Sequence, residues 1–191
     1  MDRSGDRAAG GPRGAEIHGC DETGAAADEQ PRRGYAREGD PAWVEGPGPH
    51  IRMNLVATIT NAGEVHFLTS MESMTGVRFV TFLEKLLGET RRKVFLILDR
   101  LPAHESQEVA DWVAGHGDRI ELFWLPKYAP ELNAEEYLNN DLKGAINAAG
   151  LPGSREELRS RIEWFMSQLL HLPERVRSYF QHPCVQYAAG V

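Results

Sequence analysis

The residue with the clearest chemical signature is Asp99, which directly follows an apolar run at residues 94–98. Five apolar residues that end on a carboxylate predict a strand buried on both faces, with its carboxyl end emerging at a site. In open α/β sheets, ligands and chemistry gather at these carboxyl ends. Two further acids, Asp21 and Glu22, close the short stretch 15–22. The pattern alone also permits all three acids to be solvated residues without a chemical role.

A second pair of acids, Glu135 and Glu136, opens an expected helix behind a proline-containing stretch. Asn133 stands three positions before Glu136, so the two residues could form a capping box that only stabilises the helix start. On a helical wheel, Glu135 lies nearer than Glu136 to the apolar stripe that runs through Leu138. The geometry of the helix therefore does not choose between the two acids.

The elements that must position these acids follow one another as strand and helix patterns. Two β-branched runs, at 53–60 and 64–69, are joined through Asn61-Ala-Gly63 and predict a hairpin. The later elements are recognised by the period of their apolar residues. They are helices at 75–89, 102–116, around Glu136, 154–172 and 173–180, and strands at 94–98 and 120–125. With the stretch 15–22, this order predicts an α/β fold in which a mixed sheet is flanked by helices.

Composition limits the class of protein. The 191 residues are 41% hydrophobic, which suffices for one domain with a sizeable core. No apolar run is long enough to span a membrane, no secretory leader is visible, and two cysteines do not make a disulfide framework. We therefore expect a cytoplasmic protein without a membrane partner. The net charge of −7 disfavours a self-sufficient nucleic-acid binder, which would normally be basic.

Two strings carry a resemblance to a known family: Asp99-Arg-Leu-Pro-Ala-His104 and Leu125-Pro-Lys-Tyr-Ala-Pro-Glu-Leu-Asn-Ala-Glu-Glu136. They resemble the signature of mariner-like bacterial insertion-sequence transposases, which are DDE superfamily endonucleases with a ribonuclease-H-like catalytic core. Family members show a strand ending in Asp-Asn, a nearby His, and Pro-x-Tyr-Ser/Ala-Pro-Glu-Leu-Asn-Pro-x-Glu opening a helix. The resemblance continues at 15–24, 34–39 and 173–180, so it covers nearly everything after Gly14.

The resemblance implies that Asp21, Asp99 and Glu136 are both the catalytic residues and the metal ligands of a nucleoid-associated DNA transposase. Such a protein cleaves and transfers DNA strands, and it needs three carboxylates because two Mg²⁺ ions must be held close together. Mn²⁺ is expected to substitute for Mg²⁺. Lys127 and Lys143 are candidates for contacts with DNA phosphates, although a lone Lys on a polar face is usually only solvated.

The expected organisation has three parts. Residues 1–14, rich in Gly, Arg and Ala, form a disordered amino-terminal segment. Residues 15–150 form the DDE catalytic core, and residues 151–191 form a carboxy-terminal helical segment packed on it. Within these parts, His104 is expected to open the helix at 102–116, while Trp112 and Trp164 are expected in the core.

The chain departs from the family pattern at several points. Arg100 stands where the family often has Asn, which places a cation beside the expected metal site, and Ala134 replaces a common Pro. Intact relatives carry helix-turn-helix segments before the core, and nothing here resembles them, so the usual amino-terminal DNA-binding region is expected to be missing. A homodimer and a separate amino-terminal DNA-binding half are left open as partners besides DNA. The alternatives are a non-catalytic truncated remnant or interaction module, and a phosphotransferase in which Asp99 is phosphorylated.

Overall fold

The computed structural model describes residues 14–26, 51–127, 129–150 and 152–189. Its strands are β1 (Ala15–Ala26), β2 (Arg52–Thr60), β3 (Val65–Ser70), β4 (Lys93–Leu98) and β5 (Ile120–Trp124). Its α-helices are α1 (Gly76–Glu89), α2 (Gln107–Ala114), α3 (Ala134–Ala148), α4 (Arg155–Leu169) and α5 (Pro173–Tyr179), with short 3-10 helices η2 (Pro130–Leu132) and η3 (Pro183–Ala188). The expected order of strands and helices is confirmed. The expected disordered segment lies, apart from Gly14, outside the described residues.

The five strands form one mixed sheet in the order β3-β2-β1-β4-β5. β1 is antiparallel to β2 and parallel to β4, so the predicted hairpin flanks β1 on the side away from β4. The hairpin turn is also confirmed, because Gly63 has a positive φ of 96° that other residues rarely adopt. β1 is longer than expected: it was predicted to end at Glu22, but its second half continues to pair with β2 as far as Ala26.

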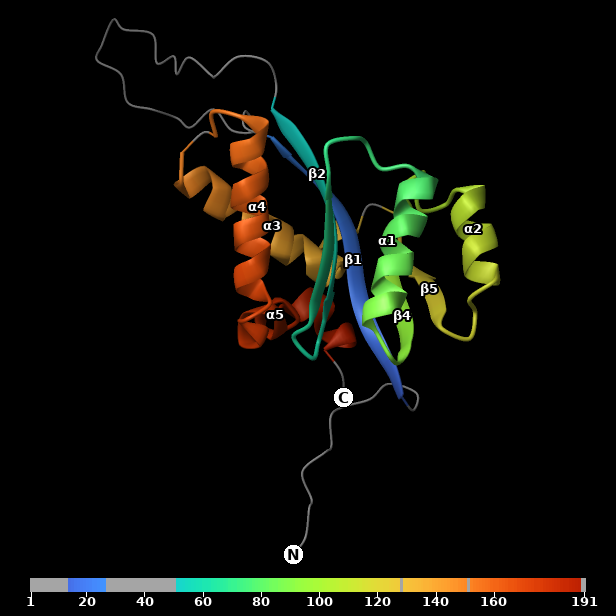
Figure 1. Ribbon diagram of the computed structural model, residues 1–191. Helices are drawn as coiled ribbons and strands as arrows, with labels where there is room; N and C mark the ends of the chain where they lie inside the picture. Colours follow the sequence, from blue (N-terminus) through green and yellow to red (C-terminus); the bar gives the residue numbers. More distant parts are fainter. Residues whose placement is uncertain (1–13, 27–50, 128, 151, 190–191) are drawn as a thin grey trace, which may run out of the picture.

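Helices cover the two faces of the sheet as separate layers (Figure 1). α1 and α2 pack on one face, where Phe79, Phe82 and Leu83 are fully buried against apolar residues of the strands. α3, α4 and α5 pack on the opposite face and share an apolar core with β2 and β3. The alternating side chains of β2 therefore meet helices on both sides, since Leu55 and Ala57 belong to one core and Val56 to the other.

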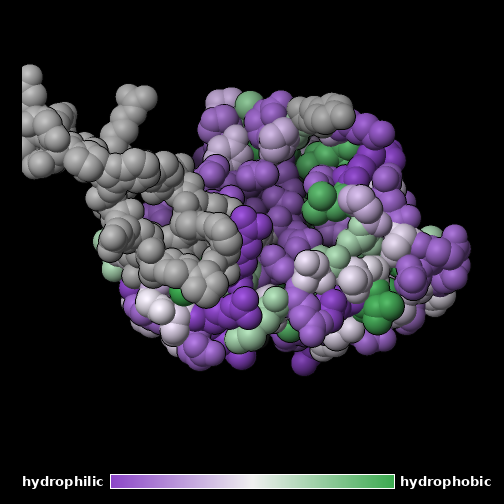
Figure 2. Space-filling view, turned by 90° about the horizontal axis from the view of Figure 1, so that it is seen from above, coloured by the Kyte–Doolittle hydropathy of each residue, from purple (hydrophilic) through white to green (hydrophobic). Residues whose placement is uncertain are grey.

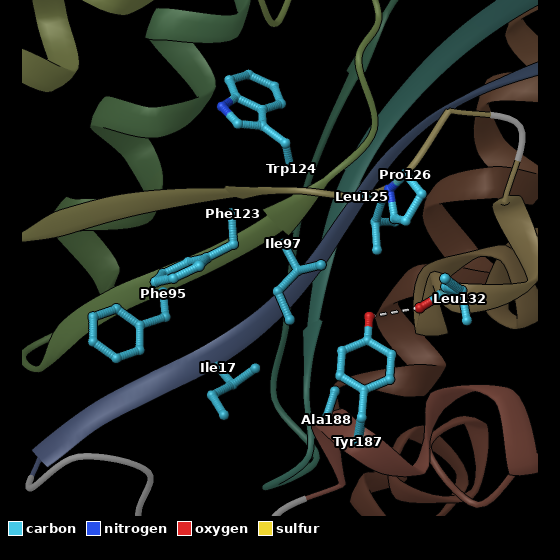
Figure 3. A pocket seen from close by; sticks show the side chains of 10 residues that line it. All are labelled: Ile17, Phe95, Ile97, Phe123, Trp124, Leu125, Pro126, Leu132, Tyr187 and Ala188. Carbon is cyan, nitrogen blue, oxygen red and sulfur yellow. Dashed lines mark hydrogen bonds between the residues drawn. The ribbon is translucent and has the colours of Figure 1, made fainter.

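The helices α3, α4 and α5 pack mainly on β1, β2 and β3, and Ile97 of β4 packs against the same core. Residues of β4 consequently alternate between buried and partly exposed positions. The partly exposed Phe95 and Ile97 line an apolar groove together with Phe123 of β5 and Tyr187, whose hydroxyl donates to the carbonyl of Leu132 at 2.7 Å (Figure 3). The expectation that this strand is buried on both faces is wrong.

Two expectations about helices also need correction. Trp164 was expected in the core, but it is 64% exposed, because α4 buries the opposite side through Leu158 and Ile162. The second helix was expected from residue 102, but α2 begins at Gln107. Trp112 is half-buried as part of the core under α2. Among the helices of the described ranges, none has the length and apolar character that crossing a membrane requires.

Candidate active site

The parallel pairing of β1 with β4 brings two of the predicted acids to the same edge of the sheet. Cys20 is paired with Leu98, so Asp21 and Asp99 each follow directly on the last residue of this paired stretch. Both acids line one pocket of about 400 Å³, and Glu136 of α3 lines it too. The other lining residues are Arg100, Leu125, Pro126, Lys127, Ala129, Pro130 and Asn133. The space-filling view from above shows mostly hydrophilic residues around the middle of the described surface (Figure 2).

The start of α3 packs closely against β1 and is hydrogen-bonded to it. Gly19 permits the close approach, because a Cβ at this position would lie 3.2 Å from Asn133 Oδ1. The side-chain amide of Asn133 donates to the carbonyl of Cys20 at 2.8 Å, and its Oδ1 accepts from the backbone N–H of Glu135 at 3.2 Å. Asn133 is thus the N-cap of α3, but the capping box with Glu136 that the sequence left open is not formed: the backbone N–H of Asn133 donates to the carbonyl of Pro130, and Glu136 lines the pocket.

Asp21 is the most enclosed acid of the pocket, with 7% of its surface exposed. Its Oδ1 accepts from the backbone N–H of Glu22 at 2.8 Å. Burial, followed by the charges of Glu136 and Asp99 and a hydrogen bond with Glu136, raises the pKa of Asp21 from 3.8 to about 8. The structure therefore brings the three predicted acids close enough for one of them to hold a proton near neutral pH.

Glu135 occupies a different environment from Glu136. It is fully buried, as its place beside the apolar stripe indicated, and it accepts a hydrogen bond from Asn139 Nδ2 at 2.6 Å. Burial, and then the charges of Asp21 and Glu136, raise its pKa well above the usual range. Asn139 also donates to Asp21 Oδ2 at 3.1 Å. The sequence reasoning missed Asn139, whose only available signal was its position one helical turn after Glu135.

Asp99 is held by the loop that follows β4. His104 Nδ1 lies 2.9 Å from Asp99 Oδ1, and the backbone N–H of Leu101 donates to the same oxygen at 3.3 Å. The His104 ring is 1% exposed and lies 4.3 Å from the ring of Phe79. His104 was expected to open the second helix; it lies instead in the turn before α2, in contact with a pocket acid.

The cations near the pocket have distinct surroundings. Arg100 donates to Glu105 at 2.7 Å and lies over the ring of Trp124 at 5.6 Å, so its charge is paired with Glu105. Lys127 lines the pocket. Lys143 is not among the lining residues, but its charge lowers the pKa of Glu135 against the larger effects that raise it. The two predicted DNA contacts therefore differ, and only Lys127 lies at the pocket.

The donor chemistry of the pocket suits a hard divalent cation. In the described ranges, no three His, Cys, Asp or Glu side chains have already converged as a metal-ligand group. Carboxylate oxygens from three separate elements nevertheless line the pocket, and they are the ligands that Mg²⁺ and Mn²⁺ accept. The pKa of Asp21 is raised by burial and then by the charges of Glu136 and Asp99, and a bound cation would offset both effects.

The fold is similar to solved structures of one transposase. The catalytic domain of Mos1 mariner transposase is matched over 92% of this chain and 83% of that chain, with a TM-score of 0.54 and 16% identity. The Mos1 strand transfer complex is matched over 92% and 55%, with a TM-score of 0.59 and 21% identity. The Mos1 paired-end complex with left transposon end is matched over 91% and 55%, with a TM-score of 0.56 and 20% identity. The chain thus spans about half the length of the transposase chains in these complexes.

These similarities define the class of fold as ribonuclease-H-like, a mixed five-stranded sheet flanked by helices. The family model described as DDE superfamily endonuclease matches residues 17–159, and the chain belongs to that family. A comparison with curated protein sequences gives no match. The expected fold class and the expected place among the DDE superfamily endonucleases are confirmed.

Proposed function

We propose that the chain is a transposase catalytic domain that performs metal-dependent cleavage and transfer of DNA strands. The observation that carries this proposal is that Asp21, Asp99 and Glu136 line one pocket, where burial, followed by the charges of Glu136 and Asp99, raises the pKa of Asp21 to about 8. Acids with strongly shifted pKa values cluster at functional sites, because these sites bring charged groups into positions that lower the stability of the fold. Membership of the DDE superfamily endonucleases supports the same reaction class.

In this proposal, Asp21, Asp99 and Glu136 hold Mg²⁺, and Mn²⁺ can take its place. Structures of the Mos1 transposase catalytic domain with raltegravir contain Mg or Mn, which supports a divalent metal. When bound, such ions activate the attacking water or 3′-hydroxyl and stabilise the leaving oxygen. Asp21 lies within β1, Asp99 directly follows β4, and Glu136 lies in the first turn of α3, which keeps the ligand set on or next to rigid elements.

DNA is the proposed substrate and partner. The structures similar to this chain include Mos1 with its left transposon end, and Lys127 at the pocket offers positive charge to a phosphate. Lys143 stays a weaker candidate because it does not line the pocket. With a net charge of −7, the chain has no general attraction for DNA, so local cations and bound metal must supply it.

The test is a strand-cleavage assay on a duplex oligonucleotide in the presence and absence of Mg²⁺ or Mn²⁺. Wild-type protein is expected to cleave only with metal, while Asp99→Asn and Glu136→Gln are expected to be inactive. Glu135→Gln serves as the matched control, because this neighbour is buried away from the pocket lining. Equal cleavage by wild type and Glu136→Gln would contradict the proposal, and no cleavage by any form would favour the truncated remnant.

A further inference from the structure

Asn139 is enclosed beside the site, with 1% of its surface exposed. The side-chain nitrogen of Asn139 carries two hydrogens, and each is donated in a hydrogen bond. It donates to Asp21 Oδ2 at 3.1 Å and to Glu135 Oε2 at 2.6 Å. The first of these bonds links α3 to the middle of β1 across 118 residues of sequence. Asn139 is thus the residue through which the middle of α3 reaches a pocket acid.

The two oxygens of Asp21 are held from different directions. Oδ1 accepts from the backbone N–H of Glu22 at 2.8 Å, and Oδ2 accepts from Asn139. One donor on each oxygen fixes the rotation of the carboxyl group, because turning it about χ2 would break both bonds. A carboxylate oxygen can accept more than one bond, so each oxygen retains acceptor capacity for a cation.

Glu135 fixes which way the Asn139 amide points. The amide nitrogen lies between Oδ2 of Asp21 and Oε2 of Glu135, and the reversed amide would place its oxygen against both carboxyl groups. Within the described residues, Glu135 Oε1 and Asn139 Oδ1 are buried without a hydrogen-bond partner. A buried polar atom without a hydrogen-bond partner lowers the stability of the fold. Stabilisation of the core therefore does not explain why Asn139 and Glu135 are buried here.

We propose that Asn139 is a positioning residue that holds Asp21 in the orientation needed for metal binding, with Glu135 as the support that orients its amide. The inference rests on the proposed function, because it gives Asp21 the role of a metal ligand. Residues that orient metal ligands without touching the metal typically change metal affinity by about 10–100-fold when replaced. Asn139 is therefore expected to affect the metal site without lining the pocket.

The test is calorimetric titration of the full chain with Mn²⁺. Asn139→Leu keeps the branching and the number of side-chain heavy atoms but has no donor, and it is expected to weaken Mn²⁺ binding by about tenfold or more. Asn140→Leu is the matched control, since Asn140 is the next residue of α3 and is exposed; its affinity should equal that of wild type. Wild-type affinity in Asn139→Leu would overturn the inference, even if that variant melted at a lower temperature.

Three further variants keep the result interpretable. Asn139→Ser leaves room for water and serves if the Leu variant does not fold; it is also expected to weaken Mn²⁺ binding. Glu135→Gln retains an oxygen that can accept from Asn139, so its affinity should stay close to that of wild type. Asp21→Asn separates the two proposals. If Asp21→Asn binds Mn²⁺ as wild type does, the proposed function itself fails; if it loses binding while both Asn139 variants keep it, only this inference fails.

Discussion

Asp99 and His104 form a pair in which a buried ring holds an acid of the pocket. His104 Nδ1 lies 2.9 Å from Asp99 Oδ1 and 3.3 Å from the backbone oxygen of the same residue. Both are acceptors, so Nδ1 carries the hydrogen and the ring donates. Because the ring also lies 4.3 Å from that of Phe79, His104 connects Asp99 to the apolar core under α1.

His104→Ala is expected to destabilise the fold by about 2–4 kcal/mol, because it leaves a cavity beside Phe79 and removes a buried hydrogen bond. Urea unfolding monitored by circular dichroism measures this change. His171→Ala is the control, since His171 is exposed in the turn after α4 and should alter stability little. If His104→Ala lowered the free energy of unfolding no more than His171→Ala does, the Asp99–His104 contact would contribute nothing to the stability of the fold.

The metal-free protein is expected to lose stability as pH rises from about 4 to 8. The pKa of Asp21 is raised from 3.8 to about 8, so within this window the folded state binds a proton that the unfolded state has released. This contribution is fully present below pH 3.8 and is lost above the folded pKa. The buried Glu135, whose pKa is also raised, acts in the same direction.

The stability difference between wild type and Asp21→Asn isolates the Asp21 contribution to this pH dependence. The variant cannot ionise at this position, so its advantage over wild type should grow between pH 5 and pH 8 in the absence of divalent ions. Chemical denaturation at several pH values gives the difference. An advantage that stayed constant across this range would show that Asp21 has an ordinary pKa in the folded chain.

Metal binding is expected to release a proton near neutral pH. Asp21 must ionise to act as a ligand, so below its pKa of about 8 the Mn²⁺ affinity should rise by up to about tenfold for each pH unit. Calorimetry in two buffers of different ionisation enthalpy measures the released protons directly. Binding without proton release at pH 7 would contradict the coupling of Asp21 to the other two acids.

DNA binding by this chain alone is expected to be weak, without sequence preference and steeply dependent on salt. The net charge of −7 leaves only local cations such as Lys127 to contact phosphates, and phosphate contacts weaken as salt rises. A mobility-shift assay at low and physiological salt, with two unrelated duplexes, checks this. A tight complex that prefers one duplex and resists salt would contradict it.

The site was predictable from sequence to the extent that local patterns encode it. The apolar run before Asp99 indicated a strand end, and the parallel partner of that strand placed Asp21 next to it. The choice of Glu136 over Glu135 came from the family motif, since the helix pattern left it open. The structure separates the two by environment: Glu136 lines the pocket and Glu135 is fully buried.

Other features depend on tertiary contacts that no local pattern carries. A run of five apolar residues predicts burial on both faces, but whether a helix covers Phe95 and Ile97 depends on where α3 and α4 pack. Trp164 has the spacing of a core residue, yet it faces outward from α4. Asn139 has the pattern of an ordinary polar helix residue, and its bond to Asp21 exists only because β1 and α3 are packed side by side in the fold.

The most direct test of the account compares the two neighbouring acids of α3 in one measurement, the calorimetric titration of Mn²⁺ into Glu136→Gln and Glu135→Gln. Glu136 lines the pocket with Asp21 and Asp99, so its replacement should abolish binding, as Asp21→Asn and Asp99→Asn should. Glu135→Gln should bind Mn²⁺ nearly as well as wild type. If Glu135→Gln abolished binding and Glu136→Gln left it intact, the assignment of the third metal ligand would be wrong.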